Sequence, residues 1–241
     1  MKFGYMSGFR ADLFSEIEFA KQYFDFTEIT IQPELLKTID NNFYDIKKAL
    51  NGFEILGHIH WEITEFDSII KNIEILESLG AKKITIHPFQ NLNIEENIKI
   101  LNKINVFLQK NKMNLLIENV SSSPYSSEDS ISKLLERIPN AGLTLDIGHA
   151  NRNLELDKFI KNLASKIQHI HLHYNIGDDD HLFYNEKEKI DEIFSKINLF
   201  GYNETILLET FSIMKNGKNV SQKFSEIKEL HIEQLKKIKN S

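Results

Sequence analysis

The sequence predicts an α/β fold, a single (β/α)₈ TIM barrel domain that spans residues 1–241. Short β-rich runs alternate strictly with amphipathic stretches, and such alternation is typical of parallel strands joined by crossover helices. The length of 241 residues matches the roughly 250 residues that one such barrel needs. The Gly-x-Gly-x-x-Gly and phosphate-loop patterns are both absent, which weakens the competing open, doubly wound sheet.

Eight strands are expected where short runs are rich in β-branched and aromatic residues. They cover residues 2–6, 26–31, 53–60, 82–87, 113–118, 142–146, 168–173 and 205–209. Eight helices are expected where apolar residues recur with a period of 3.6. They cover residues 13–24, 44–50, 69–79 (ended by Gly80), 94–108, 130–138 (stopped by Pro139), 156–163, 191–197 and 220–237. No linker or low-complexity tract interrupts them, so we expect one domain.

Composition narrows the chemistry of any site. The chain has no cysteine, which excludes disulfides, thiolate-held metals and a cysteine nucleophile. No run approaches the roughly 20 apolar residues of a membrane span, and the first residues do not resemble a signal peptide. We therefore expect a cytoplasmic protein with no membrane partner and no implied protein partner. The net charge of −6 argues weakly against an extended surface for polyanions.

Six consecutive expected strands end in His, Asp or Glu. In a barrel of this kind the chemistry lies where strands end, on the C-terminal face. Burying carboxylates after apolar runs is costly without compensation, and the chain has only three arginines, Arg10, Arg137 and Arg152. A cation is the economical compensation, and mixed His and carboxylate ligands suit zinc, manganese or iron(II). Because side chains alternate along a strand, His58 and His60 share one face of their strand, and His169, His171 and His173 share one face of theirs. Alternation does not say which member of each set binds the metal.

The order of these residues resembles one known family. The pattern is His58, His87-Pro88, Glu118-Asn119, Asp146-x-x-His149, His171-Leu172-His173, Asp179-x-His181 and Glu209-Thr210. It resembles the endonuclease IV group, the apurinic/apyrimidinic endonuclease family 2, within the xylose-isomerase-like barrel superfamily. The resemblance covers nearly the whole chain, and it is the ordered set that is specific.

The resemblance implies a centre with two to three divalent metal ions, zinc first and manganese second. One ion would be bound by His58, His87 and Glu118. A second would share Glu118 with Asp146, His171 and Glu209. The third would be bound by His149, Asp179 and His181. We expect Glu118 and Glu209 to act in catalysis, and His60, Trp61 and His173 to contact the substrate.

The chain departs from that family in its loops. Tyr174 stands where the family has an acid, and Leu182-Phe183-Tyr184-Asn185-Glu186 replaces a glycine-rich turn. Members that repair DNA are also longer, with loops that grip DNA. The expected substrate is therefore abasic-site DNA or a smaller phosphate ester.

Three functions are compatible with these residues. The first is metal-assisted hydrolysis of a phosphodiester. The alternative is a sugar (phosphate) isomerase or epimerase with one metal at Glu118, Asp146, His171 and Glu209, where two glutamates move a proton. The third is a metal-binding structural protein without turnover. The filled set at His149, Asp179 and His181 favours hydrolysis, because an isomerase has no need of it.

Overall fold

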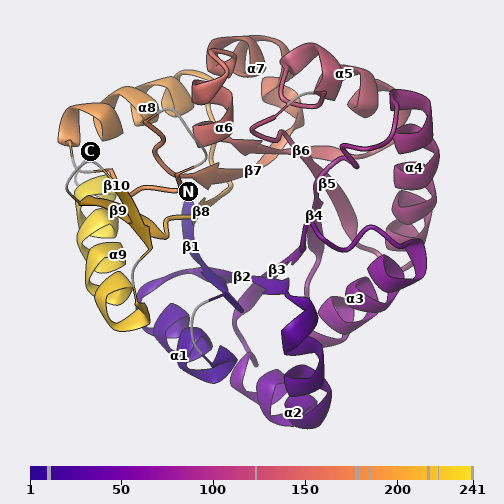
Figure 1. Ribbon diagram of the computed structural model, residues 1–241, viewed down its shortest axis with the longest axis horizontal. Coiled ribbons are helices and arrows are strands. Elements are labelled where there is room, and N and C mark those ends of the chain that lie inside the picture. Colours follow the sequence, from indigo (N-terminus) through magenta and orange to yellow (C-terminus); the bar gives the residue numbers. More distant parts are fainter. Residues whose placement is uncertain are drawn as a thin grey trace.

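Eight parallel strands close into a barrel in the computed structural model, which describes residues 1–9, 12–122, 124–176, 180–184, 186–215, 218–221 and 223–239. The strands pair in sequence order, and β8 pairs with β1 to close the ring. They are β1 (Lys2–Ser7), β2 (Phe26–Ile31), β3 (Glu54–Ile59), β4 (Lys83–Ile86), β5 (Asn114–Glu118), β6 (Gly142–Asp146), β7 (Ile167–Leu172) and β8 (Thr205–Leu208). Figure 1 looks down the barrel, with the strands inside and the helices around them. The predicted barrel is confirmed, and each strand begins and ends within about one residue of its expected position.

The helices follow the strands and cover the barrel from outside. They are α1 (Leu13–Tyr23), α2 (Leu36–Ala49), α3 (Phe66–Leu79), α4 (Ile94–Lys110), α5 (Glu128–Arg137), α6 (Ile147–Arg152), α7 (Leu156–Leu163), α8 (Lys187–Leu199) and α9 (Phe224–Lys239). Local chemistry fixes several ends. Asn93 and Glu96 form a capping box at the start of α4, and Gly80 ends α3 with a left-handed φ of 116°.

Four helices differ from the expected pattern, and one of them, α8, begins at Lys187 instead of residue 191. Helix α2 begins at Leu36, well before residue 44, because a 3₁₀ turn at Pro33–Leu35 leads directly into it. The short helix α6 was not expected. The last helix, expected from residue 220, begins at Phe224, because Val220 lies in β10 (Lys218–Ser221), which pairs with β9 (Ser212–Lys215). The hairpin signal Asn216-Gly217 stands between these strands in the sequence, although both residues lie outside the described part.

Most of the core lies between the strands and the helices, but a second, smaller apolar cluster is formed by strand residues. It contains Met6, Phe26, Leu56 and Leu207. Gly4 makes room for it, because a Cβ at Gly4 would lie 2.2 Å from the Phe26 ring. Since side chains alternate along a strand, the next residues on the same faces are Glu28, His58 and Glu209. An apolar layer inside the barrel thus supports a polar one.

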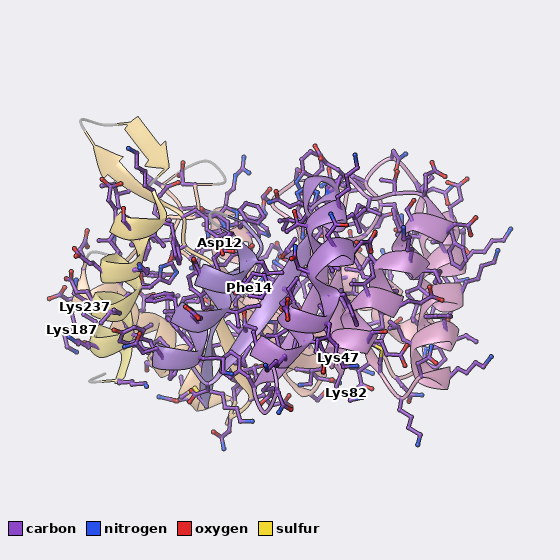
Figure 2. The ribbon with its side chains drawn as sticks, turned by 90° about the horizontal axis from the view of Figure 1, so that it is seen from below. Asp12, Phe14, Lys47, Lys82, Lys187 and Lys237 are labelled. Carbon is purple, nitrogen blue, oxygen red and sulfur yellow. The ribbon has the colours of Figure 1, made fainter. Side chains whose placement is uncertain are left out.

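The β9–β10 hairpin projects beyond the barrel at one end. Figure 2 shows it at the end where Asp12 lies after β1, opposite Lys82, which precedes β4. The hairpin therefore stands on the C-terminal face, beside the ends of the strands. Among the described residues, no helix has both the length and the apolar character that crossing a membrane requires.

Candidate metal centre

The ends of the last four strands bring four acidic and imidazole side chains together. Glu118, Asp146, His171 and Glu209 each offer one ligand atom, and these atoms all lie within 4.8 Å of one another. All four side chains are buried. The mixture of carboxylate oxygens and imidazole nitrogen is a donor set that suits zinc or manganese.

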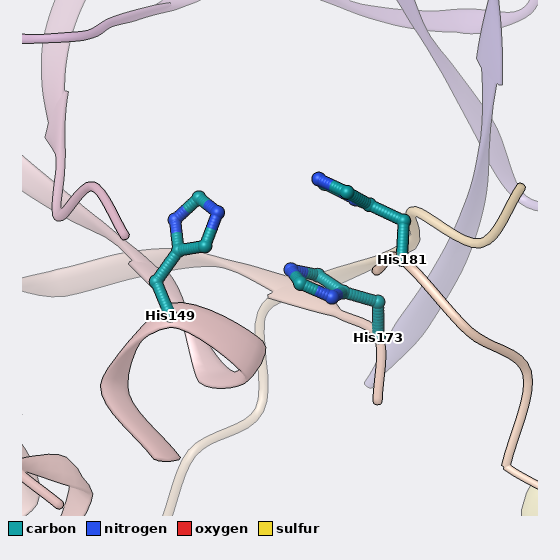
Figure 3. Close-up of side chains that lie close together, drawn as sticks. All are labelled: His149, His173 and His181. Carbon is teal, nitrogen blue, oxygen red and sulfur yellow. The ribbon is translucent and has the colours of Figure 1, made fainter. Parts of the chain in front are cut away.

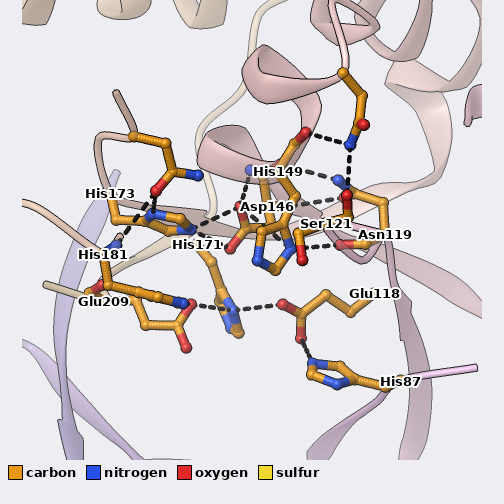
Figure 4. A network of polar contacts seen from close by, with 12 residues as sticks. His87, Glu118, Asn119, Ser121, Asp146, His149, His171, His173, His181 and Glu209 are labelled. Atoms are coloured by element: carbon orange, nitrogen blue, oxygen red, sulfur yellow. Dashed lines mark hydrogen bonds and ion pairs between the residues drawn. The ribbon is translucent and has the colours of Figure 1, made fainter. Parts of the chain in front are cut away.

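Glu118 lies between two groups of histidines. Its Oε2 is 3.0 Å from Nε2 of His58 and 3.1 Å from Nε2 of His87. Its Oε1 is 3.2 Å from Nδ1 of His171, which is also 3.0 Å from Oε2 of Glu209. Figure 4 shows Glu118 joined to His87 on one side and to His171 on the other. This is the geometry of a carboxylate that can bridge two ions.

Asp146 is held by its neighbours in the chain and by a histidine. Its Oδ1 accepts a hydrogen bond from the backbone N–H of His149 at 2.6 Å, which caps α6. The Asn119 side chain bonds both the backbone N–H and the carbonyl of Asp146. Nε2 of His173 lies 3.0 Å from the carboxylate. The strand-to-helix turn thus fixes Asp146 at the site.

A second cluster consists of three histidines, His149, His173 and His181, whose donor atoms lie within 4.8 Å of one another. Figure 3 shows the three rings gathered at one place, and those of His173 and His181 are stacked at 4.0 Å. His181 has a strained φ of 45°, and its carbonyl accepts from the backbone N–H of Phe211 at 2.8 Å. The structure therefore places His173, which we expected to contact the substrate, beside the expected metal ligands His149 and His181. Asp179, the other expected ligand, lies outside the described residues.

Sequence reasoning missed Glu28 on β2. Its side chain is fully buried, with Oε2 3.0 Å from Nε2 of His169 and Oε1 3.1 Å from Nε2 of His171. The expected site residues lie at or beyond strand ends, whereas Glu28 lies mid-strand. The signal that could have found it is a glutamate inside the run Phe26–Ile31, where an unpaired carboxylate is costly.

The carboxylates and histidines of the centre shift one another's pKa values. Burial alone would raise the pKa of Glu118, but His171, His87 and His58 together hold it well below its usual 4.5. Burial would likewise raise the pKa of Asp146, whereas His149 and His173 lower it to about 2. Burial lowers the pKa of His58 and His171, yet the facing glutamates outweigh it and raise both.

The buried carboxylates of the centre are suited to binding a cation. The ion pairs of Glu118, Asp146 and Glu209 among the described residues are all with histidines. Without a cation, the raised pKa values of His58 and His171 favour protons on these two imidazoles, which offset part of the carboxylate charge. Divalent ions can replace the protons and keep the same side chains as ligands. The residues present therefore fit a metal centre.

Two adjoining cavities open onto this centre. One, of about 250 Å³, is lined by the predicted ligands His58, His87, Glu118, His149, His181 and Glu209, together with aromatic residues that include Phe9, Trp61 and Phe211. The second, of about 570 Å³, shares His60, Trp61, His87 and Gln90 with it. Trp61 is 63% exposed. His60 and Trp61, the expected substrate contacts, thus lie where the two cavities meet.

An aromatic stack forms one wall of the smaller cavity. Phe9 stacks on Phe211 at 5.0 Å, and Phe211 stacks on His181 at 5.0 Å. The stack reaches His173 through His181. It restricts the rings of two histidines in the second cluster, and it leaves an apolar surface facing the centre.

Comparison with known proteins fits this geometry. The family model described as xylose isomerase-like TIM barrel matches residues 17–230. The chain belongs to this family. An uncharacterized protein of Methanocaldococcus jannaschii is 30% identical over 119 residues, which are 46% of this chain. The match spans 47% of that relative, so the chain covers about half of its length.

Proteins of known structure share this barrel and are named for different reactions. A D-tagatose 3-epimerase-like protein superposes with a TM-score of 0.73 at 21% identity, covering 100% of this chain and 99% of that one. An L-ribulose 3-epimerase superposes with a TM-score of 0.71 at 16% identity, covering 99% of this chain and 95% of that one. Endonuclease IV from Thermus thermophilus gives 0.68 at 14%, covering 100% of both chains. At these identities the likeness shows the fold alone.

Proposed function

We propose that this member of the family is a metal-dependent hydrolase of phosphodiesters, acting on abasic-site DNA or on a smaller phosphate ester. The observation that carries the proposal is the position of Glu118, whose Oε2 faces His58 and His87 and whose Oε1 faces His171, at 3.0 to 3.2 Å. A single-metal isomerase has no use for His58 and His87 on the far side of that carboxylate. Two ions bridged by one carboxylate are typical of phosphoryl hydrolysis.

We assign the ligand residues to three metal ions. His58, His87 and Glu118 would hold one ion, and Glu118, Asp146, His171 and Glu209 a second. His149 and His181 would hold a third, with Asp179 as proposed from the sequence and His173 beside them. Bound divalent ions supply Lewis acidity for water and for the phosphoryl oxygens. Nitrogen and oxygen donors without thiolate favour zinc, with manganese as the next choice.

The protein side chains would position and shield the reacting groups. Glu118 and Glu209 flank the same His171 nitrogen, at 3.2 and 3.0 Å, so either carboxylate can accept a proton at the floor of the cavity. Trp61 and the Phe9–Phe211 pair offer apolar faces to the rest of the substrate. The smaller cavity of about 250 Å³ suits one phosphate ester group and its immediate neighbours.

A second candidate is a sugar (phosphate) isomerase or epimerase. The set Glu118, Asp146, His171 and Glu209 is complete by itself as a single-metal site with two glutamates. The epimerases among the structures of the same fold agree with this reading. It requires one ion per chain and no role for the three-histidine cluster.

Metal content and a pair of assays test the proposal. We expect two to three zinc or manganese ions per purified chain by elemental analysis, with cleavage of an abasic-site oligonucleotide or a small phosphodiester. One ion per chain, with turnover of ketoses or their phosphates and no cleavage, would establish the isomerase instead. No bound metal, and none on titration, would overturn both.

Replacing Glu118 tests the bridge. Glu118→Gln removes the charge that two ions share, so we expect near-complete loss of activity and of at least one ion, with the fold retained by circular dichroism. Glu65→Gln is the matched control, because Glu65 is exposed, its side chain makes no capping hydrogen bond, and it belongs to no candidate metal cluster among the described residues. Wild-type turnover in Glu118→Gln would show that this residue is structural.

A further inference from the structure

A chain of buried polar contacts runs away from the metal centre into the barrel. Oε1 of Glu28 is 3.1 Å from Nε2 of His171, and Oε2 is 3.0 Å from Nε2 of His169. Nδ1 of His169 is then 2.8 Å from Oγ1 of Thr205 and 3.1 Å from its carbonyl oxygen. Both histidines and Glu28 are 0% exposed, so water cannot substitute for these partners.

Hydrogen-bonding capacity fixes where the protons are. An imidazole nitrogen 3.0 to 3.1 Å from a carboxylate oxygen needs a proton or a cation between the two atoms, and Glu28, His169 and His171 also form a candidate metal cluster. Without a cation there, an ionised carboxylate only accepts, so each imidazole that faces Glu28 donates from Nε2. Two histidines that face it hold the pKa of Glu28 below its usual value against burial, which supports the ionised form. Nδ1 of His169 then accepts from the Thr205 hydroxyl. Nδ1 of His171 is left directed at Glu118 and Glu209, within the predicted metal set.

We propose that Glu28 is a positioning residue that keeps a proton on Nε2 of His171 and so makes Nδ1 its metal-binding atom. Thr205 and His169 hold the second oxygen of Glu28 in place. The inference rests on the metal centre proposed above, but it does not depend on which reaction that centre catalyses. A carboxylate behind a ligating histidine orients the ring and raises its basicity, and its loss typically costs about 10- to 100-fold in metal affinity.

Glu28→Gln is the informative variant, because an amide has only one acceptor oxygen. It can accept from one histidine, and its NH₂ group must face the other. His169 can adapt, since the Thr205 carbonyl can accept a proton from Nδ1. We therefore expect His169 to change its tautomer, His171 to be held less tightly, and metal affinity to fall about 10-fold or more in chelator competition.

Thr27→Val is the matched control on the same strand. Thr27 is buried, its hydroxyl bonds the Tyr5 carbonyl at 2.9 Å and lies 2.7 Å from that of Ser7, and it belongs to no candidate metal cluster. The change removes buried hydrogen bonds without touching the chain from Thr205 to His171. We expect lower stability with wild-type metal affinity.

Nitrogen-15 NMR of the imidazole rings provides a readout that needs no turnover. Wild type should show protons on Nε2 of both His169 and His171, with or without metal, and Glu28→Gln should move the His169 proton to Nδ1. If Glu28→Gln does not fold, Thr205→Val removes the hydroxyl partner of Nδ1 of His169 and leaves the Glu28 carboxylate in place. The proton should then stay on Nε2 of both rings, with a smaller loss of metal affinity than in Glu28→Gln.

The outcomes separate this inference from the proposed function. Unchanged metal affinity in Glu28→Gln, or a wild-type His171 that lacks a proton on Nε2, overturns the positioning role whatever the enzyme does. Absence of both Nε2 protons in the metal-loaded wild type would mean that an ion sits between Glu28 and the two histidines, which also overturns it. A wild type that binds no metal overturns the proposed function, while the ring protons still report whether Glu28 sets the tautomer.

Discussion

At the scale of single residues, His58 and His60 show what a sequence pattern can and cannot decide. Strand alternation puts both on one face, and it leaves open which of them binds metal. In the structure, Nε2 of His58 is 3.0 Å from Glu118, whereas His60 lies against Trp61, with Nδ1 3.8 Å from Glu62. Position along the strand separates them, because His58 lies within β3 and His60 follows its last residue.

This difference predicts opposite results for two alanine variants. His58→Ala should lower the number of metal ions per chain, because one ion loses an imidazole ligand and keeps only His87 and Glu118. His60→Ala should leave the metal count unchanged and raise KM, because His60 lines both cavities and belongs to no candidate metal set among the described residues. Elemental analysis and steady-state kinetics measure both. Metal loss in His60→Ala, with full occupancy in His58→Ala, would reverse the assignment.

Glu28 shows the limit of residue-level prediction. Most of the expected ligands stand at the end of an apolar run, whereas His149, Asp179 and His181 were expected from the resemblance to a known family. Glu28 has no such position, and its partners His169 and His171 are about 140 residues away in the sequence. Contacts across the barrel between β2 and β7 follow from closure of the ring, which no local pattern encodes.

At the scale of elements, strands were predicted closely and helix starts less so. Strand limits are marked by polar residues after short apolar runs, and these residues lie on the C-terminal face of the barrel. Helix α2 gave a weak pattern, since it carries a non-helical residue at Asn42 and starts through a 3₁₀ turn. Helix α6 is only Ile147–Arg152, too short to show a period, although Asp146 is a good N-cap residue.

Gly148 in the first turn of α6 links that helix to the second cluster. A Cβ there would lie 2.1 Å from the His173 ring, which is too close for any real contact. Gly148→Ala should therefore displace His173 and weaken metal binding at the three-histidine cluster. It should do so even though alanine normally stabilises a helix interior by about 1 kcal/mol over glycine.

Metal titration and thermal unfolding of Gly148→Ala test this prediction. Gly52→Ala is the control, because Gly52 has a φ of 74° with nothing within 4 Å of an added Cβ. That variant should lose stability through backbone strain and keep its full metal content. Full metal content in Gly148→Ala would show that His173 moves freely and does not support the cluster.

At the scale of the whole molecule, the fold does not choose the reaction. Epimerases and an endonuclease share this barrel with TM-scores of 0.68 to 0.73. The choice depends on which side chains occupy the strand ends. The carboxylates at the centre pair with histidines, so protons and any bound metal ions would compete for the same imidazoles.

This competition predicts opposite pH dependences for the metal-free and the metal-loaded protein. The pKa values of His58 and His171 are raised above 6.5 in the folded chain, because facing glutamates outweigh burial. A raised folded pKa contributes stability that is fully present below pH 6.5 and is lost as the pH rises through the folded value. The pKa values of His169 and His173 are lowered by burial, so those groups titrate below this window.

In the presence of a chelator we therefore expect Tm to fall as the pH rises above 6.5. Each unit of raised pKa corresponds to about 1.4 kcal/mol. With metal present, the ions displace those protons and bind more tightly as the pH rises, so the gap in Tm between the two forms should widen. Differential scanning fluorimetry from about pH 6 to 9 measures it, and His58→Gln should flatten the chelator curve. A gap that stays constant with pH would mean that protons and metal ions do not share these imidazoles.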